Sequence, residues 1–89
     1  MYKMNVNKIR NIIVQLDKMP DIIYEYDKYI ICKYVFQDYT IIFKFTDEHV
    51  FITYLLNGNT YINDEIISLY DTEYMNIVIS EYASRIKEA

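Results

Sequence analysis

The stretch YTIIFKFTDEHVFITYLL, residues 39–56, decides the fold. It contains two runs rich in β-branched and aromatic residues, 39–46 and 49–56, joined by a two-residue link. Runs of this composition around a short link are typical of paired strands. A third such run, KYIICKYVF at 28–36, precedes them across another short link. Because short links join antiparallel neighbours, the pattern predicts a three-stranded antiparallel meander.

The segments that flank this meander extend it. DIIYEY at 21–26 either lengthens the first strand or forms a fourth one. Asn57-Gly58 fits a type I′ turn, which would fold NTYI at 59–62 back as a short strand. Apolar residues recur at helical spacing over 5–18, and Pro20 marks the end of that segment. The chain is therefore expected to begin with an amphipathic helix.

The C-terminal part predicts one helix or a broken pair. Asn63 is a candidate N-cap for DEIISLY (64–70), and the acids Asp64 and Glu65 suit a first helical turn. Thr72 is a candidate cap for a second helix that runs to about residue 87. Its apolar residues share one arc, which we expect to be buried: Met75, Val78, Ile79, Tyr82 and Ile86.

Together these segments predict a single α+β domain over 1–89, with the order α-β-β-β-α. It has an N-terminal helix, an antiparallel meander of three or four strands, and a C-terminal helix or broken helix pair.

Both faces of the predicted sheet are apolar. Strand alternation places Ile41, Phe43 and Phe45 on one face, with Val50, Ile52 and Tyr54 as their candidate partners. The opposite face contains Ile42, Phe51 and Leu55, where a face open to water would have polar residues. We therefore expect both faces to be covered, either by a helix on each side or by a second subunit. In the second case Ile42, Phe51 and Leu55 form the dimer face.

The cysteine content and the apolar runs indicate where in the cell the protein is expected. Cys32 is the only cysteine, so the fold does not depend on an intramolecular disulfide. The apolar runs are far shorter than the ~20 residues that span a bilayer, and the N-terminus has no hydrophobic signal region. We expect a cytoplasmic protein that does not enter membranes.

The charge of the chain is unevenly distributed. The net charge is −4, and residues 45–84 contain seven carboxylates without a single Lys or Arg. Nucleic-acid backbones are bound by clustered Lys and Arg, so direct nucleic-acid binding is not expected from this half. A weak contact between phosphates and the N-terminal helix, through Lys8 and Lys18, stays open as a minor alternative. The acidic half should instead attract a basic partner.

The sequence contains few residues that could act in catalysis or bind a metal ion. A dyad of Cys32 and His49, the only histidine, would need the two side chains in contact, but a strand separates their predicted positions. A buried cysteine and a surface histidine are the simpler interpretation. Zinc would need more Cys and His ligands, and one glycine is too few for a Gly-rich phosphate loop. The polar residues around Gly58 do not fit the EF-hand pattern, which leaves only an irregular cation site. We expect no enzyme, no cofactor and no metal.

These observations favour a small acidic protein that binds another protein. Ile77 is expected to project from the last helix among Glu73, Ser80, Ser84 and Glu88, as an apolar anchor inside an acidic rim. The candidate partner-binding residues are Tyr61, Asp64, Glu65, Tyr70, Asp71, Glu73, Tyr74, Ile77 and Glu81. In size, charge and layout the chain is similar to phage-encoded anti-CRISPR and anti-restriction inhibitors, some of which present carboxylates to a DNA-binding groove.

That similarity implies a viral inhibitor that acts in the host cell, on a host protein with a basic, nucleic-acid-binding surface. The alternative is a self-associating structural or assembly module that uses the second apolar sheet face as a homodimer interface.

Overall fold

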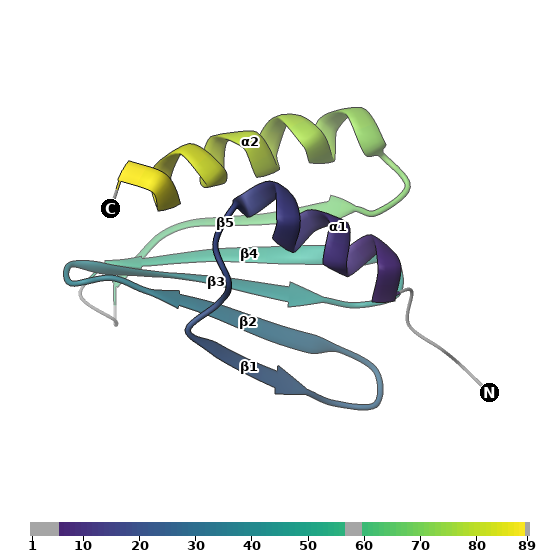
Figure 1. Ribbon diagram of the computed structural model, residues 1–89, viewed down its shortest axis with the longest axis horizontal. Coiled ribbons are helices and arrows are strands. Elements are labelled where there is room, and N and C mark those ends of the chain that lie inside the picture. The colour runs from purple at the N-terminus through teal and green to yellow at the C-terminus, as the bar shows by residue number, and fades with distance from the viewer. Residues whose placement is uncertain (1–5, 57–59, 89) are drawn as a thin grey trace.

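The computed structural model describes the backbone of residues 6–56 and 60–88, and the side chains within these ranges except those of residues 6, 8, 60–64 and 88. It is an α+β fold with a helix at each end and an antiparallel sheet between them (Figure 1). The elements in chain order are α1 (Val6–Leu16), β1 (Ile22–Glu25), β2 (Ile30–Val35), β3 (Tyr39–Phe45), β4 (His49–Leu56), β5 (Thr60–Ser68) and α2 (Thr72–Glu88). The predicted fold class is confirmed.

The sheet is a simple meander in which each strand pairs with the next, in the order β1-β2-β3-β4-β5. The segment at 21–26 forms a separate edge strand, β1, rather than an extension of β2. In the centre, Phe43 of β3 lies opposite Cys32 of β2 and Ile52 of β4, so these three side chains share one face. The predicted partners Ile41 and Tyr54, and Phe45 and Val50, are likewise in register.

The helix predicted over residues 64–70 is wrong, because residues 64–68 belong to strand β5 and residues 69–70 to the turn that follows it. Its burial alternates as in a strand: Ile66 is exposed, whereas Ile67 and Leu69 are buried. β5 pairs with the whole length of β4, from His49 to Leu56, with one register shift at Tyr54/Leu55. Pairing with β4 therefore outweighs the local preference for a helix start at Asn63 to Glu65, because the stability of a strand depends on the strand beside it.

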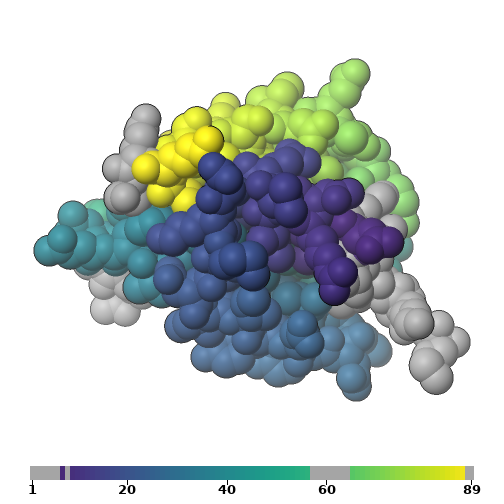
Figure 2. Space-filling view, in the orientation of Figure 1, coloured from purple at the N-terminus to yellow at the C-terminus, as the bar shows by residue number. Residues whose placement is uncertain are grey.

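Both helices cover the same face of the sheet, side by side (Figures 1 and 2). From α1, Ile9, Ile12 and Leu16 enter the core. The arc predicted for the last helix is buried as expected: Met75, Val78, Ile79, Tyr82 and Ile86. These side chains pack over the sheet face that carries Phe43, and α1 contacts α2 directly. The expectation of a helix on each side is wrong, because neither described helix lies on the opposite face.

The ends of the helices are fixed by local contacts. Asp17 follows α1 in the left-handed region, at φ 59°, which stops the helix. The buried Tyr34 hydroxyl then donates a hydrogen bond to the Lys18 carbonyl, at 2.6 Å, and holds this turn against β2. At the start of α2 the Asp71 carboxylate accepts the N–H of Tyr74, at 3.3 Å, so Asp71 is the N-cap instead of Thr72. In the part of the chain that the structure describes, no helix combines the length and apolar character needed to cross a bilayer.

Candidate functional site

The outer surface of α2 and the adjoining strand β5 carry an acidic patch. We define the acidic patch as Glu65, Asp71, Glu73, Tyr74, Ile77 and Glu81, all of which were candidates from the sequence. β5 is an edge strand and packs beside α2, which brings Glu65 to the helix. On α2 itself, Glu73 and Tyr74 lie four and three residues before Ile77, and Glu81 lies four residues after it, so they form neighbouring positions on one side.

Tyr74 connects the two elements of this patch. Its hydroxyl donates a hydrogen bond to the Glu65 carboxylate, with 3.3 Å between the oxygens. The pKa of Tyr74 is raised, first by the charge of Glu65 and its hydrogen bond, then by loss of water around the hydroxyl, and further by the charges of Glu81 and Asp71. The structure thus brings together acids that are up to 16 positions apart in the chain, from Glu65 to Glu81.

Ile77 is an exposed apolar side chain within the patch. Its exposed fraction is 58%, while the neighbouring Val78 and Ile79 are buried. Glu73 and Glu81 lie four residues before and after it, one helical turn away on each side. An apolar centre with a charged rim is the usual layout of a protein–protein interface. The position predicted for Ile77 is confirmed, whereas its role in binding stays a prediction.

The positive charges near the end of α2 are engaged elsewhere. The Arg85 guanidinium lies over the Tyr54 and Tyr82 rings, at 5.5 and 5.8 Å from their centroids. The Lys87 ammonium pairs with the Asp17 carboxylate of the α1 turn, at 3.4 Å. Among the described side chains, none of the patch carboxylates forms an ion pair. Within the described part of the chain, no ion pair therefore neutralises the negative field of the acidic patch.

The other residues predicted for the binding site lie beside the acidic patch or outside the described side chains. Tyr70 is 72% exposed and lies in the turn before α2, next to the acidic patch. Tyr61 and Asp64 belong to β5, but their side chains lie outside the described residues. The irregular cation site predicted around Gly58 falls there too. In the described part of the chain, no three His, Cys, Asp or Glu side chains are grouped to hold a metal ion.

Cys32 and His49 are separated by the sheet. Cys32 is buried on the helix-covered face, whereas His49 has the opposite parity on β4 and lies beyond β3. Burial raises the pKa of the Cys32 thiol to about 11, with a smaller contribution from the charge of Glu25. At neutral pH the group is a thiol in the core, without a histidine in reach to remove its proton. The predicted buried cysteine is confirmed.

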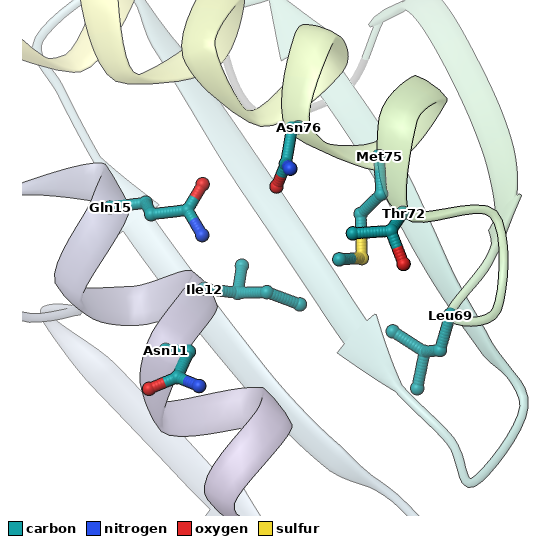
Figure 3. A pocket seen from close by; sticks show the side chains of 7 residues that line it. All are labelled: Asn11, Ile12, Gln15, Leu69, Thr72, Met75 and Asn76. Atoms are coloured by element: carbon teal, nitrogen blue, oxygen red, sulfur yellow. The ribbon is translucent and has the colours of Figure 1, made fainter.

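A pocket of about 300 Å³ opens between α1 and α2 (Figure 3). Ile12, Leu69 and Met75 form its apolar part, and the amides of Gln15 and Asn76 point toward it from the two helices, while Asn11 lies at its edge on α1. Thr72 completes the lining. None of these seven side chains is ionisable, so the pocket supplies hydrogen bonds and no acid–base chemistry.

The sheet face away from the helices carries a second group of side chains, of which the sequence had singled out only Phe51. We call it the cation–aromatic row: Tyr24, Tyr26, Tyr29, Lys33, Lys44 and Phe51. The Lys44 ammonium lies 4.7 Å from the Tyr29 ring centroid and 5.6 Å from that of Phe51. Lys33 lies 5.6 Å from the Tyr24 centroid. The row could have been found by strand parity, since Tyr24 pairs with Ile31, Ile31 with Lys44, and Lys44 with Phe51.

Comparisons with protein-family models, with curated proteins and with solved structures found no match to this chain.

Proposed function

We propose that this protein is a non-catalytic binding module whose acidic patch occupies a basic, nucleic-acid-binding surface of another protein. The observation that carries the proposal is the contact of Tyr74 with carboxylates of two elements, Glu65 of β5 through its hydroxyl and Asp71 through its N–H, with the exposed Ile77 on the same helix. No described cation pairs with these carboxylates. They are therefore available to the Lys and Arg side chains of a partner.

The mechanism is competition with nucleic acid. Carboxylates on a rigid helix and strand stand in for backbone phosphates and steer the protein toward a basic groove. Ile77 and the ring of Tyr74 then add apolar contact, which a nucleic-acid backbone does not provide. Such a protein acts as an inhibitor by occupancy. The similarity in size, charge and layout to phage anti-CRISPR and anti-restriction proteins supports a viral inhibitor of a host protein.

Charge reversal with a matched control tests the electrostatic part. The immobilised protein is used to capture partners from a bacterial lysate, and the captured protein is then tested for loss of DNA or RNA binding. We expect Glu65→Lys/Glu81→Lys to abolish capture. Glu25→Lys/Asp38→Lys makes the same change in net charge at exposed positions outside the patch and should retain capture. Capture that resists both rising salt and the patch reversal would contradict the proposal.

The role of Ile77 in binding is tested by comparing its substitution with that of Val14. Ile77 and Val14 are both exposed apolar residues on helices, at 58% and 74% exposure, but only Ile77 lies in the acidic patch. Ile77→Ser should weaken binding of the captured partner by about tenfold or more, as central apolar anchors do. Val14→Ser should leave that affinity unchanged. Equal affinities for the two variants would show that Ile77 is not part of the interface.

A further inference from the structure

The sheet face opposite the helices is open and largely apolar. No described element covers it, although it carries Ile31, Val35, Ile42, Phe51, Leu55 and Ile66. Several of its side chains are well exposed, among them Tyr24 at 44% and Ile66 at 66%. An apolar surface that spans a five-stranded sheet is unusual on a protein that acts alone.

Among its described side chains, the same face carries two positive charges, Lys33 and Lys44. Lys33 and Lys44 lie over aromatic rings, and neither forms an ion pair with a described carboxylate. Tyr26 links their two rings, since it stacks on Tyr24 at 6.4 Å and on Tyr29 at 4.6 Å between centroids. An acidic surface on a partner would complement this cation–aromatic row.

A symmetric contact of two open faces does not meet this need. Lys44 lies on β3, the central strand, and Lys33 on the adjacent β2. Two such faces in contact would bring four ammonium groups together without a described carboxylate between them. Ammonium groups that lose water without a counter-charge are strongly unfavourable.

A single-stranded nucleic acid fits the face less well than a protein does. Stacking of bases needs aromatic rings along the whole path of the strand. Beyond the row, however, the face carries no aromatic ring on β3, where Ile42 and Thr40 follow Lys44. Two lysines also neutralise few phosphates, and the excess of carboxylates elsewhere opposes binding.

We propose that the open face binds a second copy of this chain, with the cation–aromatic row of one copy against the acidic patch of the other. The two surfaces are complementary in charge, and each has apolar side chains at its centre. Lys33 and Lys44 would face Glu65 and Glu81, and Ile77 would contact the aliphatic part of the sheet. The inference depends on the acidic patch of the proposed function, because self-association hides the surface that the partner would use.

Complementary charge swaps test the contact by sedimentation velocity. The row variant Lys33→Glu/Lys44→Glu and the patch variant Glu65→Lys/Glu81→Lys should each associate about tenfold or more weakly than the wild type. A mixture of the two variants should restore association, because each variant keeps the surface that the other has lost. This restoration requires both variants to be folded, which circular dichroism and thermal melting check independently. Raising sodium chloride from about 50 to about 500 mM should weaken wild-type association.

Two further variants match the net charge of those above. Arg10→Glu/Lys87→Glu and Glu25→Lys/Asp38→Lys change exposed residues outside both surfaces and should associate like the wild type. A monomeric wild type at high concentration would overturn the inference. Wild-type association that persists in both the row variant and the patch variant would overturn the inference and indicate an interface that does not depend on these charges. Oligonucleotide binding that requires Lys33 and Lys44, in a protein that does not self-associate, would assign the row to nucleic acid instead.

The inference and the proposed function can fail separately. Self-association with the predicted swap pattern, together with no capture of a basic protein, would leave only the inference standing. Capture that the patch reversal abolishes and the row reversal does not, with a monomeric wild type, would leave only the proposed function.

Discussion

The hydroxyl of Tyr74 and the carboxylate of Glu65 are joined by a hydrogen bond of 3.3 Å that links α2 to β5. This contact exists because residues 64–68 form part of an edge strand beside the helix, not the helix that the local sequence predicts. It places one carboxylate against the ring while Glu81 and Asp71 add their charges. The acidic patch is thus a product of packing between two elements.

Removal of the Glu65 charge should lower the pKa of Tyr74. The charge of Glu65 and its hydrogen bond are the main causes that raise this pKa above its ordinary value of 10.0, because they favour the neutral hydroxyl. In Glu65→Gln the repulsion of the phenolate is reduced, and the titration should move toward 10.0. NMR of the Tyr74 ring during an alkaline titration measures the change. Glu48→Gln, outside the patch, is the control, and an unchanged pKa in Glu65→Gln would show that the contact does not form in solution.

Cys32 should make the folded protein less stable as the pH rises above 9. Its pKa rises from 9.0 to about 11 on folding, so within this window the unfolded chain has lost a proton that the folded chain keeps. The free energy of unfolding therefore falls by up to about 1.4 kcal/mol per pH unit in this window. The contribution of Cys32 to stability is fully present only below pH 9.0, the pKa of the thiol in the unfolded chain. Cys32→Val removes the titrating group at similar volume.

Urea denaturation between about pH 8 and about pH 11 compares the two proteins. The decline in stability should be shallower in Cys32→Val. Some decline should persist in both, since burial also raises the pKa of Tyr34. Parallel curves for the two proteins would contradict the assignment of the effect to Cys32.

Loss of the Asp71 cap should destabilise α2. The Asp71 carboxylate accepts the N–H of Tyr74, one of the amides at the start of the helix that have no partner within it. Asp71→Ala should cost about 1 kcal/mol of unfolding free energy, and Asp71→Ser should recover most of it. Thr72→Ala should have a smaller effect, because Thr72 is the first residue inside the helix. A larger loss in Thr72→Ala than in Asp71→Ala would move the cap to Thr72.

Neighbouring isoleucines on α2 should respond differently to truncation. Ile79 is fully buried, and its replacement by Ala should cost about 2–5 kcal/mol through lost burial and a cavity. Ile77 is 58% exposed, and Ile77→Ala should change stability by no more than about 0.5 kcal/mol. Chemical denaturation measures both. A large loss in Ile77→Ala would mean that this residue is needed for the fold, and it could no longer serve as a test of binding.

Much of this protein follows from local sequence. The helical spacing of Ile9, Ile12 and Leu16 and the two-residue alternation of Ile41, Phe43 and Phe45 identified their elements and their buried sides. The arc of the last helix was equally plain. In each case the signal is contained in one segment, because the period of burial matches the period of the backbone. The absence of Lys and Arg from residues 45–84 also identified most of the acidic patch.

Features that depend on contacts between elements were determined only by the tertiary structure. Residues 60–68 became strand β5 because β4 offered an open edge, and this pairing outweighed the capping signals at Asn63 to Glu65. Each helix has one apolar stripe, and both stripes cover the same sheet face, which no single segment specifies. The opposite face was left open, and strand register gathered Lys33 and Lys44 there among aromatic rings. Sequence alone set the chemistry of each surface, and only packing set which residues meet on it.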